Sequence, residues 1–140
     1  MLGQDDVLRL LPFRPPWLLV DSVDSWVPGE RIELTKVFRS DDPLVISHLD
    51  TRQDIVPGVL LIELVGQAGF LLGRLTDPLK PTNFLTRCKA HFFSPAFSGQ
   101  QLKVEVTLTG STGSASICRG VIYLRRQKVC EVESMGMSVD

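Results

Sequence analysis

One carboxylate stands in the most apolar stretch of the chain. Glu63 lies within residues 56–72, where most neighbours are aliphatic or glycine. A carboxylate in such surroundings loses hydration, which costs free energy unless a partner compensates. Gln67 follows one helical turn later, at the spacing where side chains on a helix meet. Glu63 is therefore a candidate for proton transfer, with a structural carboxylate bonded to backbone or to an arginine as the alternative.

The residues before this carboxylate predict a site for a polarised oxygen. Pro57 and Gly58 lead directly into the apolar stretch, and proline is tolerated in the first turn of a helix. The amides of Gly58 and Val59 would then lack helical partners and carry the positive end of the helix dipole. A thioester carbonyl bound there would be polarised, as in an oxyanion hole.

His48 is the second candidate for acid/base chemistry. It lies in a polar loop, residues 40–54, that precedes the apolar helix, and a histidine in such a loop is most often simply solvated. Spacing alone does not place it near Glu63. The chain has two histidines, His48 and His91, and no recognisable set of acids or cysteines to complete a metal site, so no metal is expected.

The elements that must position these residues follow from periodicity and turn signals. We expect a short helix, two strands, one buried helix apolar on nearly every face, and then a meander of four strands. These elements are assigned to residues 5–11, 17–27, 31–38, 59–72, 82–93, 101–109, 116–125 and 128–139. Antiparallel strands with a single buried helix predict an α+β fold, in which a curved sheet wraps the helix, in one domain spanning residues 1–140.

Composition narrows the class of protein. The chain has 140 residues, 44% of them hydrophobic, and a net charge of -1, which argues against disorder and against a broad basic field for nucleic acid. The three cysteines match no zinc or redox spacing and indicate reduced thiols in a cytoplasmic protein. No signal peptide is visible, and residues 56–72 fall short of the roughly 20 residues that span a bilayer, so no membrane is expected.

Four stretches resemble the 3-hydroxyacyl-acyl-carrier-protein dehydratases of fatty acid synthesis (the FabZ type). The first is similar to the family's opening segment, Pro-His-Arg-Tyr-Pro-Phe followed by Leu-Leu-Val-Asp. The second is similar to Asn-Glu-Pro-Phe-Phe-x-Gly-His, which ends on the catalytic histidine. The third resembles Pro-Gly-Val-Leu-Ile-x-Glu-Ala-x-Ala-Gln, which supplies the catalytic glutamate, and the fourth Phe-Arg-x-Pro-Val-x-Pro-Gly-Asp-x-Leu. They occupy residues 7–21, 41–48, 57–67 and 92–102.

The resemblance implies a hotdog fold, paired as a homodimer or assembled as a trimer of dimers, in which the histidine of one protomer faces the acid of the other. It implies elimination of water from a 3-hydroxyacyl thioester on an acyl carrier protein, with no cofactor. His48 would remove a proton, Glu63 would assist departure of the hydroxyl, and Gly58, Val59 and Gln67 would bind the thioester. The acyl chain would lie in an apolar tunnel along the dimer interface.

The chain departs from the family around the histidine. His-Phe-Pro is replaced by His48-Leu49-Asp50, and one extra residue separates His48 from Pro57. Phe13 replaces a histidine and Phe93 an arginine. Two other functions stay open: a hotdog thioesterase in which Glu63 activates water, and a non-catalytic module that binds an acyl chain or its carrier.

An acyl carrier protein is strongly acidic, whereas this chain is nearly neutral, so docking must use a local basic patch. The candidates follow the buried helix or lie on the next strand, and the alternative is that they are ordinary solvated charges. They are Arg74, Lys80, Arg87 and Lys89.

Overall fold

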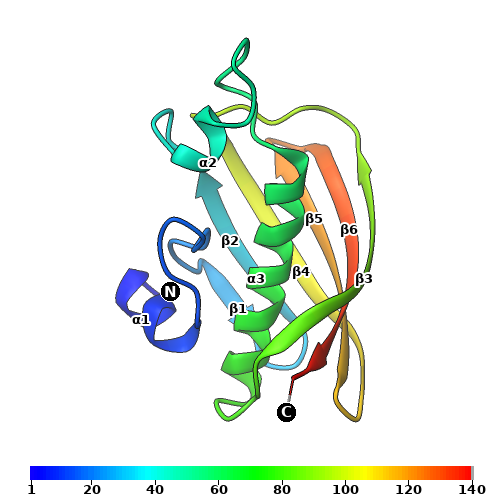
Figure 1. Cartoon of the computed structure of the whole chain (residues 1–140). Coiled ribbons are helices and arrows are strands. Elements are labelled where there is room, and N and C mark those ends of the chain that lie inside the picture. The colour runs from blue at the N-terminus through cyan, green and yellow to red at the C-terminus, as the bar shows by residue number, and fades with distance from the viewer. Residues whose placement is uncertain (140) are drawn as a thin grey trace.

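A long helix lies in the concave face of a six-stranded antiparallel sheet in the computed structural model, which describes residues 1–139 (Figure 1). The helices are α1 (Gln4–Leu10), α2 (Pro43–Ile46) and α3 (Gly58–Thr76). The strands are β1 (Ser25–Val27), β2 (Arg31–Val37), β3 (Asn83–Phe92), β4 (Gln101–Thr112), β5 (Ala115–Leu124) and β6 (Gln127–Ser138). The expected α+β architecture of one helix wrapped by a curved antiparallel sheet is confirmed.

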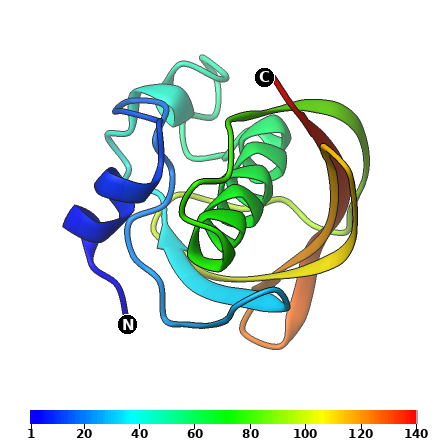
Figure 2. The same cartoon turned by 90° about the horizontal axis from the view of Figure 1, so that it is seen from below.

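The central helix is held by its apolar face. Pro57 caps α3 and Asp77 ends it, and the side chains that point to the sheet are fully buried, among them Leu61, Leu64 and Leu72. Burying one such side chain contributes about 1.5–3 kcal/mol. The sheet curls around α3 when the molecule is seen along the helix (Figure 2). The helix is buried on most sides, as expected, but Val59 is 72% exposed and Glu63 is half-buried.

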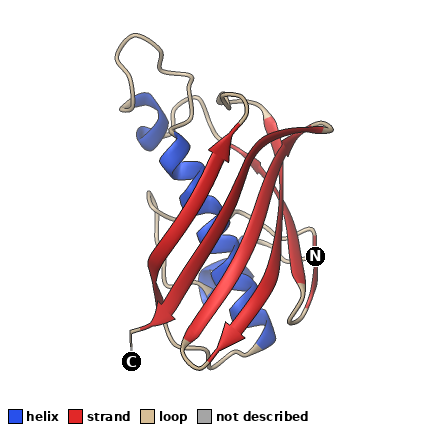
Figure 3. Ribbon diagram, turned by 90° about the vertical axis from the view of Figure 1, so that its right-hand side faces the viewer, coloured by secondary structure: helices blue, strands red, loops and turns tan. Residues whose placement is uncertain are grey.

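The strand order in the sheet is β1-β2-β4-β5-β6-β3. Figure 3 shows the sheet lying in front of the long helix. The expected meander of four strands is therefore wrong for its first member, because β3 pairs with β6 and not with β4. Residues 93–100 carry the chain from β3 across the end of the sheet to β4 (Figure 1). This crossover passes the first turn of α3, and it leaves β3 as an edge strand.

The segment before β1 also differs from expectation. Only Ser25–Val27 of the expected strand at residues 17–27 is a strand. The Pro15–Pro16 peptide bond is cis, and the amide of Trp17 donates to Arg14 O at 2.9 Å, so the chain turns here. The residues that follow are held by side chains of other elements instead of by a strand ladder.

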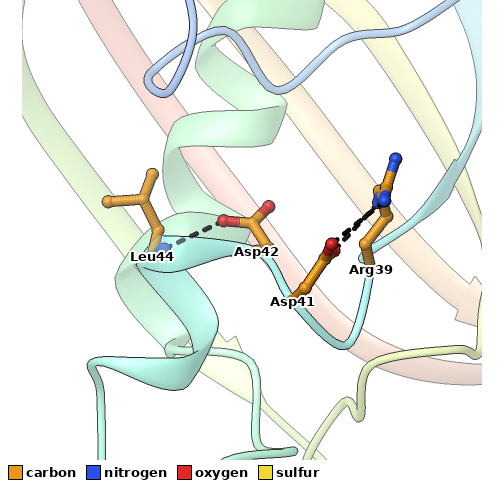
Figure 4. Close-up of polar contacts among 4 residues, drawn as sticks. All are labelled: Arg39, Asp41, Asp42 and Leu44. Carbon is orange, nitrogen blue, oxygen red and sulfur yellow. Dashed lines mark hydrogen bonds and ion pairs between the residues drawn. The ribbon is translucent and has the colours of Figure 1, made fainter.

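A one-turn helix, α2, lies inside the loop that was expected to be irregular. Asp42 caps it by accepting from Leu44 N at 2.9 Å, and Pro43 occupies the first turn (Figure 4). Arg39 forms two hydrogen bonds to Asp41 just before the cap, and these bonds hold the pKa of Asp41 below its usual value. α2 ends at Ile46, and residues 47–57 then lead to the start of α3.

Replacing Gly120 by alanine tests how closely α3 approaches the sheet. A Cβ at this position on β5 would lie 2.8 Å from Val65 Cγ2, which is too close for a carbon contact. We expect Gly120→Ala to lower the free energy of unfolding by about 1–3 kcal/mol in urea denaturation, because the helix must shift outward.

Gly66→Ala is the matched control. This glycine lies on α3, and no atom of another element lies within 4 Å of the place that a Cβ would occupy. Alanine should therefore raise the free energy of unfolding by up to about 1 kcal/mol through helix propensity. Equal stability of Gly120→Ala and the wild type would contradict close packing at Val65.

Candidate active site

Glu63 lies on the second turn of α3 and is held through one carboxylate oxygen. Its Oε1 accepts from Trp17 Nε1 at 3.0 Å and from Gln67 Nε2 at 3.1 Å. The contact with Gln67 confirms the one-turn spacing read from the sequence. The expected alternative partner, an arginine, is absent from this carboxylate among residues 1–139.

Gln67 is the buried hub of this arrangement. Its side chain is 1% exposed; its Oε1 accepts from Leu19 N at 2.9 Å, and its Nε2 also donates to Trp17 O at 2.8 Å. The amide thus takes the place of a neighbouring strand for residues 17–19. The other end of this segment is fixed by the nearly buried Lys36, whose Nζ donates to Asp21 Oδ2 at 3.1 Å.

His48 lies in the loop between α2 and α3, close to the first residue of α3. Its Nδ1 lies 3.4 Å from Ile55 O. If Nδ1 carries the proton, it donates to this carbonyl and leaves Nε2 as the basic nitrogen. The loop between His48 and α3 is anchored to the crossover, because Val56 N donates to Ala96 O at 2.8 Å.

His48 and Gly58 line the same cavity, which has a volume of about 400 Å³. The residues that complete its wall come from the start of α3, the end of β3 and the crossover. They are Ile55, Val56, Leu61, Phe92, Phe93, Ser94, Pro95 and Ala96. A Cβ on Gly58 would lie 3.2 Å from the Phe92 ring, so a side chain here would push that ring aside and crowd the cavity.

The start of α3 supplies the expected amide donors to this region. The helix begins at Gly58 after Pro57; the Leu60 amide already donates to Pro57 O at 3.0 Å, which leaves the Gly58 and Val59 amides as the candidate donors. The Val59 side chain points to solvent, so this residue can contribute its backbone amide rather than its side chain. A carbonyl oxygen bound beside His48 would meet the positive end of the helix dipole.

Glu63 lines a second cavity of about 460 Å³, which does not include His48. Its floor is formed by Gly66, Gly69 and Gly73 of α3, and Phe13 and Phe70 are among the apolar side chains around it. The phenylalanine rings pack edge to face with centroids 6.1 Å apart. The chain therefore brings His48 and Gly58 together in one cavity and places Glu63 in another.

The four basic candidates do not form one patch. Arg74 donates to Lys80 O at 2.6 Å and to Leu10 O at 3.1 Å, and its guanidinium lies over the Phe70 ring. Lys80 donates to Ser116 Oγ at 3.1 Å and is half-buried. Arg87 and Lys89 are exposed and lie two residues apart on the edge strand β3. Of the four candidates, only this last pair is exposed.

Among the described residues, Cys118 is the cysteine that lines a cavity, the one that contains Glu63. Burial raises the pKa of Cys130 to about 11, and burial also raises the pKa of Cys118 although Lys80 opposes this shift. A buried thiol with a raised pKa is a poor nucleophile near neutral pH. Cys88 is exposed on β3 and lines neither cavity.

Trp17 is the site residue that sequence reasoning missed. It stands 46 residues before Glu63, and no periodic pattern connects the two. The one signal in the sequence is that Trp17 stands where the opening motif of the resembled family has phenylalanine. A phenylalanine side chain has no N–H to donate.

Comparisons with solved structures define the class of protein. The dehydratase heterocomplex ApeI:P from Xenorhabdus doucetiae superposes with a TM-score of 0.80 at 19% identity, over 96% of this chain and 91% of that chain. The E. coli PaaI protein from the phenylacetic acid degradation operon gives 0.65 at 16% identity, over 82% and 80%. A hot-dog-like protein from Thermanaerovibrio acidaminovorans gives 0.66 at 14% identity, over 80% and 82%. The chain is a hotdog-fold protein.

Sequence relatives narrow the class to a family. The 3-hydroxyacyl-[acyl-carrier-protein] dehydratase FabZ of Anaeromyxobacter sp. (strain K) is 34% identical over 96% of this chain and 88% of its own length. The FabZ dehydratase of Clostridium tetani is 34% identical over 94% of both chains. A scan against protein-family models gave no match. The chain belongs to the FabZ family of 3-hydroxyacyl-[acyl-carrier-protein] dehydratases.

Replacing Gln67 by leucine tests its role as the hub. The variant replaces the polar amide by an apolar side chain of similar size and leaves Leu19 N, a buried donor, without its acceptor. We expect Gln67→Leu to lower the free energy of unfolding by about 1–3 kcal/mol in urea denaturation. The exposed Gln53 is the control, and Gln53→Leu should change stability by less than about 0.5 kcal/mol. Similar losses in both variants would contradict the hub.

Proposed function

We propose that the protein removes water from a 3-hydroxyacyl thioester carried on an acyl carrier protein and gives the trans-2-enoyl thioester, in fatty-acid biosynthesis. The observation that carries this proposal is the family membership over nearly the whole chain. The cavity shared by His48 and Gly58 supports it, because a base and an amide donor stand together there.

The reaction needs a base, an acid and a polarised carbonyl. Amides at the start of α3, those of Gly58 and Val59, donate to the thioester oxygen and acidify the adjacent carbon C2. His48 takes the proton from C2, the electron pair forms the C2–C3 double bond, and the C3–O bond breaks. Glu63 delivers a proton to the departing hydroxyl, directly or through water, so that the products are the enoyl thioester and water.

The active form of this proposal is a homodimer. His48 and Glu63 line different cavities of one protomer, so a complete site requires the histidine of one copy and the acid of the other. Strand β3 has a free edge in the described chain, and Phe84, Leu85 and Phe93 are each at least half exposed on or beside it. A second copy would cover both the unpaired edge and the apolar surface. A trimer of dimers is the larger assembly we consider.

The proposed partner is an acyl carrier protein in the cytoplasm. Its acidic surface would meet Arg87 and Lys89 on β3, since Arg74 and Lys80 are engaged within the protomer. Helix α3 meets the length and composition of a membrane span, but it is the core helix of this fold, with Leu61, Leu64 and Leu72 buried against the sheet.

The acid/base pair is tested with His48→Ala and Glu63→Gln. Each should lower dehydration of a 3-hydroxyacyl carrier by at least about 10²-fold, because general acid/base action contributes about 10²–10⁴-fold per group. Mass spectrometry of the carrier follows the loss of water directly. The controls His91→Ala and Glu30→Gln change exposed residues of the same types outside both cavities and should keep wild-type turnover.

The same assay separates the rival functions. Release of free acid by the wild type would support hydrolysis, and an unchanged carrier would support a binding module. Turnover at the wild-type rate in His48→Ala or Glu63→Gln would contradict the assigned roles.

Mixing the two inactive variants tests the shared site. A heterodimer of His48→Ala and Glu63→Gln rebuilds one intact site of two, so a statistically mixed sample should recover about one quarter of wild-type turnover. Light scattering should give at least a dimer mass. A sample that stays inactive although mass spectrometry detects the heterodimer would contradict a site shared between protomers.

Carrier docking is tested with Arg87→Glu and Lys89→Glu. Charge reversal should raise KM for the carrier-bound substrate by roughly three- to tenfold at low salt, and the effect should shrink as salt rises. The control Lys103→Glu makes the same charge change on the convex face of the sheet and should leave KM unchanged. Equal loss on a small thioester without carrier would place the damage in the fold or the cavity.

A further inference from the structure

Three groups around Glu63 form a closed ring of hydrogen bonds. Gln67 Nε2 donates to Trp17 O at 2.8 Å and to Glu63 Oε1 at 3.1 Å. The indole of the same tryptophan returns to Glu63, with Trp17 Nε1 donating to Oε1 at 3.0 Å. Trp17 is thus held through its backbone carbonyl by the Gln67 side-chain amide, and it holds the Glu63 carboxylate through its indole N–H.

We propose that Trp17 is a positioning residue for Glu63: its indole N–H fixes the carboxylate so that Oε2 is the oxygen presented to substrate. This proposal rests on the function proposed above and adds a residue to its machinery. Among residues 1–139, the hydrogen bonds to the carboxylate all end on Oε1, and none reaches Oε2.

A glutamate side chain has three rotatable bonds and loses substantial rotamer freedom when it is ordered. Gln67 alone, one turn away on α3, constrains the carboxylate from the helix side. Trp17 comes from the segment before β1 and constrains it from a second direction. Two donors from different elements fix both the place of Oε1 and the plane of the carboxylate, whereas one donor leaves rotation about the hydrogen bond free.

The position of Trp17 is itself determined by its surroundings. Its amide donates to Arg14 O at 2.9 Å and its carbonyl accepts from Gln67, while the Leu18 amide also donates to Arg14 O and the buried Leu19 donates to Gln67 Oε1. Trp17 is 46% exposed, although its indole N–H is bonded to Glu63. A phenylalanine at this position would keep the ring but could not donate.

The two tryptophans of the chain provide a matched comparison. Trp17→Phe should lower kcat for dehydration about tenfold, which corresponds to about 1.4 kcal/mol in the barrier, and change KM by less than about twofold. Trp26→Phe removes the other indole, which lies on β1 opposite Ile32 and lines neither cavity, and should keep wild-type kcat and KM. Circular dichroism and thermal unfolding check that both variants fold.

NMR of the indole N–H reports the hydrogen bond from Trp17 to Glu63 independently of any activity assay. In the Trp26→Phe background, Trp17 gives the single indole N–H resonance of the protein, and Glu63→Gln should move this resonance because the acceptor changes from a carboxylate to an amide. The corresponding control, Glu30→Gln, should leave it in place.

Each outcome decides the proposal. A tenfold loss of kcat with a moving resonance supports it. Wild-type kcat in Trp17→Phe while Glu63→Gln is inactive, or a resonance that ignores Glu63→Gln, would overturn it and leave the proposed function intact. A wild-type protein that does not dehydrate a 3-hydroxyacyl carrier would overturn the proposed function and with it the catalytic purpose of Trp17, although the resonance would still show the bond.

Discussion

The burial of α3 in the concave face of the sheet is the constraint on which the site depends. Val65 packs against Gly120 of β5, and Gly69 lies close to Cys118 of the same strand, so these contacts fix the rotation of the helix about its axis. Once the rotation is fixed, Glu63 lies in the cavity that strands β3 to β6 help to line, and the first turn points to the end where the crossover passes. The chemistry is thereby set by apolar packing, since no polar interaction of comparable extent orients the helix within the described residues.

The same packing separates the two halves of the site. The crossover after β3 and the loop after α2 close around the start of α3 and enclose His48 with Gly58. The face that carries Glu63 opens instead toward Phe13 and the glycines of α3. His48 with Gly58 and Glu63 therefore line separate cavities of the chain.

The sequence predicts those parts of the fold that depend on local pattern. Helix α3, strand β2 and the strands β4 to β6 follow from periodicity and turns, and the contact between Glu63 and Gln67 follows from helical spacing. The failures share a physical cause, namely long-range partners that replace the local rule. The segment from Trp17 to Asp24 has strand-like residues, yet the Leu19 amide donates to Gln67, Asp21 is paired with Lys36, and Val23 forms only an isolated bridge, to Leu2, so no ladder forms before Ser25. The place of β3 beside β6 and the bond from Trp17 to Glu63 are equally non-local, and local pattern cannot show either.

The pairing of β3 with β6 also bears on how the chain folds during synthesis. β3 ends at Phe92 and its partner ends at Ser138, so 46 further residues must be made before the ladder can be completed. At ribosomal rates of about 5–20 residues per second, this interval is roughly 2–9 s. During this interval, part of the apolar face of α3 is exposed, and β3 has no strand paired with it. Chaperone binding to the nascent protein would therefore matter most in this period. The period ends when β6, the last strand to be synthesised, pairs with β3.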